Sequence, residues 1–240
     1  MMRSRGAAAA IALLTIVGWD AAAAREHRVT FRTDDGVTIA AEWYEPSPRP
    51  GPAVVLVHML HRSKRDLDPL ARRLASEGIG ALAIDLRGHG ESTGSAESGG
   101  SDGGAYAAMV GDIRAARRFL AARADVQPAR IGVAGASLGA NLAALAAASD
   151  PAIAAVALIS PSLDYRGLRI EGAMRKVARP ALLVASDDDP YAARSARELQ
   201  KAGGGPRELI VVSQAGHGTA MLSREGDLFR TLVDWFRRTL

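Results

Sequence analysis

The stretch that decides the fold is Arg130-Ile131-Gly132-Val133-Ala134-Gly135-Ala136-Ser137-Leu138-Gly139-Ala140-Asn141. It passes from an apolar strand through a Gly-x-Ser-x-Gly turn into a helix rich in alanine and leucine, which is typical of a nucleophile elbow. Gly135 and Gly139 carry no Cβ, so the backbone on either side of the serine can come close together. The pattern predicts Ser137 as a nucleophile; the alternative is an ordinary Gly/Ser turn that enters a helix.

The rest of the chain predicts an α/β fold around this elbow. Its 240 residues are 48% hydrophobic and 23% charged, which suits one globular domain. From residue 53 onward, apolar strands alternate with helical segments, which indicates a mostly parallel sheet with helices on both faces. Residues 28–44 alternate in polarity around Asp34-Asp35-Gly36, so we expect an antiparallel N-terminal hairpin at one edge.

The N-terminus has the plan of a secretory signal peptide. Arg3 and Arg5 precede an apolar run over 7–17, and four alanines end at Ala24. We expect cleavage near Ala24, a mature α/β domain over 25–240, a periplasmic or secreted protein, and no stable membrane anchor after cleavage; the alternative is an uncleaved anchor. The chain has no cysteine, so it forms neither disulfides nor a cysteine-linked lipid anchor.

The positive charge does not indicate a nucleic-acid partner. The net charge is +4, and arginine pairs such as Arg72-Arg73, Arg117-Arg118 and Arg237-Arg238 lie in helical stretches among alanine and leucine. Solvated helix faces account for such pairs, and aromatic residues for base stacking are scarce.

A serine nucleophile needs an imidazole base and a carboxylate that orients the imidazole. His217 is the only histidine after Ser137, and it follows the last expected strand, over 208–212. Three aspartates follow the expected strand over 181–185. Asp189, just before a proline, is the first choice for the acid and Asp188 the second. The aspartate triplet also fits a helix N-cap region or a cation site, although no other carboxylate cluster completes a metal site.

The oxyanion formed during acyl transfer needs two N–H donors. One is expected from the backbone of Leu138 and the other from the loop after the strand over 53–57, with Leu60 as the first choice and Met59 as the second. His58 is expected to brace this loop, and His89 is given the same structural role. The loop over 58–61 contains no glycine, which argues against a dinucleotide-binding fold.

Taken together, these motifs resemble those of the α/β-hydrolase-fold serine hydrolases. The resemblance implies Ser137, Asp189 and His217 as the catalytic triad, and neither a metal nor an organic cofactor. The connection over 160–179 is short, and in that respect the chain resembles lidless esterases and dienelactone-hydrolase-like proteins. Met59 departs from the family pattern, because many members carry glycine at that position. The residues that match the family are Val55–His58, Asp85–Ser92, Gly135–Gly139, Asp187–Tyr191 and Ala215–Gly218.

These observations predict an exported serine hydrolase that cleaves a carboxylic ester of a small or partly exposed acyl group through an acyl-enzyme. The same triad would serve a peptidase, a thioesterase or an acyltransferase, and a non-catalytic binding protein of the cell envelope is a further alternative. The expected partner is a small-molecule ester. The side chains expected to line an acyl pocket are those of Met59, Leu60, Tyr165, Tyr191 and Met221.

Overall fold

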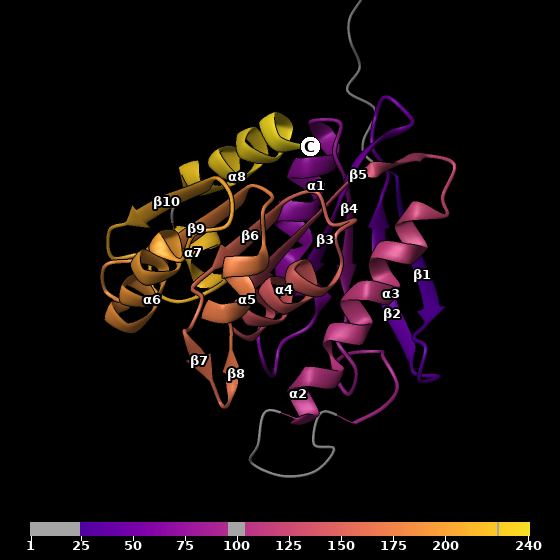
Figure 1. The fold of residues 1–240 in the computed structure, drawn as a ribbon. Helices are drawn as coiled ribbons and strands as arrows, with labels where there is room; N and C mark the ends of the chain where they lie inside the picture. Colours follow the sequence, from indigo (N-terminus) through magenta and orange to yellow (C-terminus); the bar gives the residue numbers. More distant parts are fainter. Residues whose placement is uncertain (1–24, 96–103, 225) are drawn as a thin grey trace, which may run out of the picture.

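A computed structural model describes residues 25–95, 104–224 and 226–240. Its centre is an eight-stranded sheet with the order β1-β2-β4-β3-β5-β6-β9-β10 (Figure 1). The first two strands pair antiparallel, β2 joins β4 antiparallel, and all later pairs in this sheet are parallel. The strands are β1 (Glu26–Arg32), β2 (Thr38–Tyr44), β3 (Gly51–Val57), β4 (Gly80–Ile84), β5 (Val126–Ala136), β6 (Val156–Ile159), β9 (Ala181–Ser186) and β10 (Arg207–Val212).

Helices cover both faces of this sheet. Figure 1 looks onto the face that carries α3 (Val110–Ala121), α4 (Leu138–Ser149) and α6 (Pro190–Lys201). The opposite face carries α1 (Asp68–Ser76) and α8 (Gly226–Thr239). The shorter elements are η1 (Lys64–Leu67), α2 (Gly104–Ala108), α5 (Glu171–Lys176), α7 (Ala220–Arg224) and a small hairpin of β7 (Asp164–Tyr165) and β8 (Leu168–Arg169).

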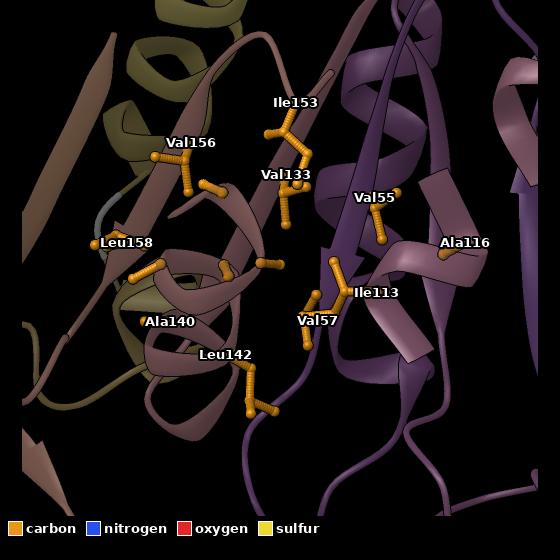
Figure 2. Close-up of a cluster of buried hydrophobic side chains, with 14 of the residues drawn as sticks. Val55, Val57, Ile113, Ala116, Val133, Ala140, Leu142, Ile153, Val156 and Leu158 are labelled. Carbon is orange, nitrogen blue, oxygen red and sulfur yellow. The ribbon is translucent and has the colours of Figure 1, made fainter. Parts of the chain in front are cut away.

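The core follows from the alternation of side chains along the buried strands. Val55 and Val57 of β3 belong to the core cluster that also contains Ile113 of α3 and Leu142 of α4 (Figure 2). Leu56, between them in sequence, packs on the other face with the residues of α1 and α8. Strands buried on both faces therefore carry continuous apolar runs, as a parallel sheet requires.

The predicted fold class, an α/β-hydrolase fold with a mostly parallel sheet and an antiparallel N-terminal hairpin, is confirmed. Three local predictions differ from the structure. The helix expected over 106–124 is broken at Met109 into α2 and α3. The connection over 160–179 contains the β7–β8 hairpin as well as one short helix, and α7 replaces part of an expected loop. The predicted signal segment, 1–24, lies outside the described residues.

Candidate active site

The elbow has the close packing that its glycines predict. Ser137 lies between β5 and α4, as the N-cap of α4, with φ of 52° and ψ of −115°, a positive φ that is rare for a residue with a Cβ. A Cβ on Gly135 would lie 2.1 Å from the Gly139 carbonyl oxygen, and a Cβ on Gly139 would lie 2.4 Å from that of Val57. Only glycine fits at both positions. The contact with Val57 also brings the end of β3, and the loop that follows it, beside the serine.

Three residues expected to act together lie within hydrogen-bonding distance. His217 Nε2 is 2.8 Å from Ser137 Oγ, and His217 Nδ1 is 2.5 Å from Asp189 Oδ2. Asp189 also caps α6, because its Oδ1 accepts a hydrogen bond from the Ala192 N–H at 3.2 Å. With the imidazole proton on Nδ1 facing the carboxylate, Nε2 is free to accept the proton of the serine hydroxyl.

The other two aspartates of the triplet bind the backbone of the histidine loop instead of the imidazole. Asp187 Oδ1 accepts from the Gln214 N–H at 2.7 Å, and Asp188 Oδ1 accepts from the Gly216 N–H at 3.0 Å. The pKa of Asp187 is lowered chiefly by the bond from Gln214, and the pKa of Asp188 chiefly by a bond from the Ser186 hydroxyl. Asp188, the second choice for the acid, therefore bonds to the backbone of the histidine loop, whereas Asp189 bonds to the imidazole itself.

The loop after β3 is organised by His58, which is fully buried. Its Nδ1 lies 2.6 Å from the Met59 carbonyl oxygen, and its Nε2 accepts a hydrogen bond from the Leu86 N–H at 3.0 Å. Burial lowers the pKa of His58 to about 4, so the ring is neutral at pH 7. With both ring nitrogens occupied, His58 joins two loops and has no free atom to serve as a base.

A buried ion pair fixes the same two loops further along. Lys64 Nζ donates to Asp85 Oδ2 at 2.6 Å and to Glu91 Oε2 at 2.7 Å, and the Lys64 N–H donates to Asp85 Oδ1 at 2.8 Å. Burial alone would raise the pKa of Asp85, but bonds from the Glu91 N–H and from Lys64 outweigh it and lower that pKa. No role for Lys64 or Asp85 was predicted from the sequence.

His89 packs against His58. Its ring centroid lies 5.1 Å from that of His58, and its Nδ1 lies 3.0 Å from the Arg87 carbonyl oxygen. The ring is 7% exposed, and among the described residues its Nε2 has no hydrogen-bond partner.

The expected oxyanion donors lie on the two elements that the elbow brings together. Leu138 is the first residue of α4, where backbone N–H groups have no partner within the helix. Met59 and Leu60 lie in the loop after β3, close in sequence to the Val57 and His58 carbonyl groups that press on Gly139. Within the described residues, none of these three N–H groups donates a hydrogen bond to the protein.

Of the five side chains expected at an acyl pocket, four are at least partly accessible. Met59 and Leu60 are partly buried, as is Tyr165, whose ring packs edge-on against Tyr106 with 6.0 Å between centroids. Tyr191 is 50% exposed, and its hydroxyl donates to the Asp164 carbonyl oxygen at 3.3 Å.

The assignment of Met221 to the pocket is wrong. Met221 is 0% exposed and packs in the core cluster that includes α8. The sequence predicted a loop here, whereas α7 forms a turn of helix that directs this side chain into the core.

The β7–β8 hairpin is attached to the helix that follows the nucleophile. Asn141, one turn after Ser137, donates from Nδ2 to the carbonyl oxygens of Ser162 and Leu168 at 2.9 and 3.1 Å. Its Oδ1 accepts from the Ser162 N–H at 3.0 Å. Asn141 is fully buried, so all three of these bonds are shielded from water. No role for Asn141 was predicted from the sequence.

Three buried polar side chains that shape the site share a position in the fold that a sequence can reveal. Asp85, Ser160 and Ser186 lie at or just after the carboxyl ends of buried strands, where their polar side chains reach neighbouring loops. A buried polar residue at such a position rarely lacks a partner. The same expectation of a buried partner applies to Asn141, because it is polar within an otherwise apolar helix.

Two broader features bear on the class of site. Across residues 25–95, 104–224 and 226–240, histidine, aspartate and glutamate form no group of three or more that could hold a metal ion. Within those same residues, no helix combines the length and the apolar character needed to cross a bilayer.

Comparison with known proteins agrees with this architecture. The family described as serine aminopeptidase, S33, matches residues 48–202. An uncharacterized protein of Mycobacterium tuberculosis is 30% identical over 232 residues, covering 88% of this chain and 78% of that protein.

Two solved structures share the fold at low sequence identity. A dienelactone hydrolase from Anabaena variabilis has a TM-score of 0.76 at 20% identity, with coverage of 91% of this chain and 99% of that one. The esterase Pf2001 of Pyrococcus furiosus has a TM-score of 0.73 at 17% identity, with coverage of 95% and 96%. This chain therefore belongs to the serine aminopeptidase, S33, family and is an α/β-hydrolase-fold hydrolase.

Proposed function

We propose that this protein is an exported serine hydrolase that cleaves a carboxylic ester of a small or partly exposed acyl group. The observation that carries the proposal is the placement of His217 between two partners, 2.8 Å from Ser137 Oγ and 2.5 Å from Asp189 Oδ2. Such spacing lets one imidazole remove a proton from the serine while the carboxylate holds its orientation.

In the acylation step, Ser137 Oγ attacks the ester carbonyl carbon as its proton passes to His217 Nε2. The tetrahedral intermediate places a negative charge on the former carbonyl oxygen, which the N–H groups of Leu138 and Leu60 stabilise, with Met59 as the alternative to Leu60. The intermediate then collapses, the bond to the alcohol oxygen breaks, and the imidazolium returns its proton to the departing alcohol. An acyl-enzyme on Ser137 remains.

In the deacylation step, His217 removes a proton from water, and the resulting hydroxide attacks the acyl carbon. A second oxyanion forms at the same N–H donors. The bond to Ser137 Oγ breaks, the serine regains its proton from the imidazolium, and the carboxylic acid leaves. Asp189 keeps the imidazole in one tautomer and stabilises its charged form through both steps.

The architecture around the site supports a small acyl group. The segment between β6 and β9, where lipase-like relatives carry a helical lid, contributes only the β7–β8 hairpin and α5 here. Tyr165 lies in β7 and Tyr191 in the first turn of α6, and we expect these two side chains to supply a modest apolar surface. Without a helical lid, we expect the protein to cover a short acyl chain better than a long one.

Reaction with a fluorophosphonate probe tests the nucleophile. We expect covalent labelling of the wild type and none of Ser137→Ala, because the probe reacts with the activated hydroxyl. Labelling that persists in Ser137→Ala would assign the nucleophile to another residue. Hydrolysis of p-nitrophenyl esters of rising acyl length then tests the substrate class. We expect kcat/KM to be highest for short chains, and a maximum at long chains would refute the argument from the missing lid.

A peptidase is the second candidate, because the matching family is described as a serine aminopeptidase. The same nucleophile and base would cleave an amide if the site also bound a free α-ammonium group. Aminoacyl p-nitroanilides compared with p-nitrophenyl esters separate the two. Faster turnover of the anilides would favour the peptidase over the esterase.

Export is supported by the basic, apolar and alanine-rich order of residues 1–24. N-terminal sequencing of the protein recovered from the periplasm or the medium tests it. We expect the mature chain to begin within a residue or two of Arg25. Recovery of the intact chain from the cytoplasm would refute export.

A further inference from the structure

The loop that carries His217 depends on side chains from neighbouring strands for its shape. Gln214, Gly216 and Gly218 have φ angles of 49°, 83° and 60°, so the backbone turns too sharply to pair with itself in a regular way. Four of its N–H groups donate to side-chain oxygens: Gln214 to Asp187, Ala215 to Ser186, Gly216 to Asp188, and Gly218 to Ser160.

Ser186 and Asp188 form the central part of this arrangement. Ser186 is the last residue of β9 and is fully buried, and its Oγ accepts from the Ala215 N–H at 2.8 Å. The same hydroxyl donates its proton to Asp188 Oδ1, which also accepts from the Gly216 N–H at 3.0 Å. The two side chains thus hold the two residues immediately before His217 against the end of a rigid strand.

We infer that Asp188 and Ser186 are positioning residues that set the distance between His217 and Ser137 by holding the backbone of residues 215–216. The inference rests on the proposed function for its kinetic consequence. Asp189 bonds to the imidazole itself, whereas Asp188 acts one residue earlier, through the peptide chain. Neighbouring carboxylates of identical chemistry therefore have separate roles, one on the side chain of the base and one on its backbone.

The contact between Ser137 and His217 is sensitive to small movements of the loop. A hydrogen bond of 2.8 Å is lost when the atoms separate by about 1 Å, and misplacement on that scale can reduce turnover about 100-fold. The glycines on both sides of His217 offer little resistance to such movement. The hydrogen bonds to Ser186 and Asp188 supply the restraint that the loop sequence lacks.

Two variants at residue 188 separate hydrogen bonding from charge. In Asp188→Ala both bonds are lost, and we expect kcat to fall about 10- to 100-fold with KM unchanged, because the Asp188 carboxylate bonds to Ser186 and to the backbone of Gly216. In Asp188→Asn the amide oxygen still accepts both bonds, less strongly, so we expect kcat within about threefold of the wild type. Equal losses in the two variants would overturn the assignment.

A control variant separates positioning from loss of stability. Asp125 precedes β5 at the opposite end of the sheet, where it accepts bonds from Arg123 at 2.8 Å and from Trp43 at 3.3 Å. We expect Asp125→Ala to lower the melting temperature and to leave kcat unchanged. A fall in kcat matching that of Asp188→Ala at equal stability would overturn the inference.

Hydrogen–deuterium exchange provides a readout that does not depend on any substrate. In the intact protein, we expect the peptide containing residues 214–218 to exchange faster in Asp188→Ala and in Ser186→Ala than in the wild type or in Asp125→Ala. Unchanged exchange would refute the restraint itself. If the wild type neither reacts with fluorophosphonate nor cleaves esters, the proposed function fails, while the exchange measurement still decides whether these side chains hold the loop.

Discussion

Met59 and Thr219 join the two loops that flank Ser137. Met59 Sδ accepts hydrogen bonds from the Thr219 N–H at 3.2 Å and from the Thr219 hydroxyl at 3.5 Å. A Cβ on Gly218 would lie 2.2 Å from the same sulfur. The methionine that stands where many relatives carry glycine therefore has a structural use, because it links the loop of the expected oxyanion donors to the loop of His217.

Met59→Leu tests this link. Leucine keeps the volume but cannot accept a hydrogen bond, so we expect a loss of about 1 kcal/mol in unfolding free energy. We also expect kcat to fall about tenfold as the two loops separate. Urea denaturation and steady-state ester hydrolysis measure the two effects. The matched control is Met174→Leu, the same exchange at a buried residue of α5, which should leave kcat unchanged. Wild-type kcat in Met59→Leu would contradict the link.

Ser137 stores backbone strain that glycine would release. Its φ of 52° disfavours any residue with a Cβ, and such strain costs about 1–3 kcal/mol. We expect Ser137→Gly to be more stable than Ser137→Ala by about 1 kcal/mol, with activity lost in both. Thermal denaturation measures the difference.

The control for this comparison is Ser149, the last residue of α4. There the order should reverse, since alanine is favoured over glycine in a helix by about 1 kcal/mol. If alanine were also the more stable replacement at residue 137, the elbow would not be strained.

Removal of Lys64 should leave a buried carboxylate without its cation. The side chains of Lys64 and Asp85 are only 5% and 0% exposed, so we expect Lys64→Met to cost about 3–5 kcal/mol in unfolding free energy. The comparison variant is Lys201→Met, at an exposed pair with Glu198, which should change stability by about 0.5 kcal/mol or less. Similar losses in both variants would show that burial adds nothing to the pair.

The same pair gives an acid-dependent signature. The pKa of Asp85 is lower in the folded protein than in the unfolded chain, so the unfolded chain takes up its proton first as the pH falls. The stabilisation is complete above about pH 4 and is lost below it. Urea denaturation of the wild type at pH 7 and pH 3.5 should show this loss, and the decrease should be smaller in Lys64→Met. An equal decrease would argue against Asp85 as its source.

The lowered pKa of His58 should make the protein less stable as the pH falls, over a higher pH range than the one in which Asp85 acts. Burial lowers its pKa from 6.5 to about 4, so between these values the unfolded chain binds a proton that the folded protein does not. The stabilisation is complete above about pH 6.5, and about 2 kcal/mol of it should be lost by pH 5. We expect His58→Asn to lack this component in urea denaturation, whereas the exposed His27→Asn should retain it. An unchanged pH dependence in His58→Asn would place the effect elsewhere.

The parts of the fold that were predictable are those in which local pattern and long-range packing agree. The strand before Ser137 is apolar because it is buried on both faces, and the glycines around Ser137 mark close backbone contact. The β7–β8 hairpin was not predictable from periodicity, because strands of two residues show no alternation. Its turn at Arg166 and Gly167, with φ of 49° and 88°, would have been the better signal.

The site was predictable where chemistry restricts the choice of residue and less so where packing decides. His217 was the only histidine available downstream, and the structure brings it to Ser137 and Asp189. Asp189 could be ranked first from its place before a proline, but the separate contacts of Asp187 and Asp188 depend on the directions in which the loop points their side chains. The prediction for Met221 failed because the side chain follows the register of α7, a helix too short to leave a pattern in the sequence.

The hydrogen bonds of Asn141 hold the base of the β7–β8 hairpin, whereas its exposed tip is held by the bond from the Gly167 N–H to Asp164 and by that from Arg166 to the Tyr106 hydroxyl. New chain could enter at that tip during evolution without disturbing either the sheet or the helix that follows Ser137. A protein engineer could use the same point to graft a cap over the site and so redirect the enzyme toward bulkier acyl groups.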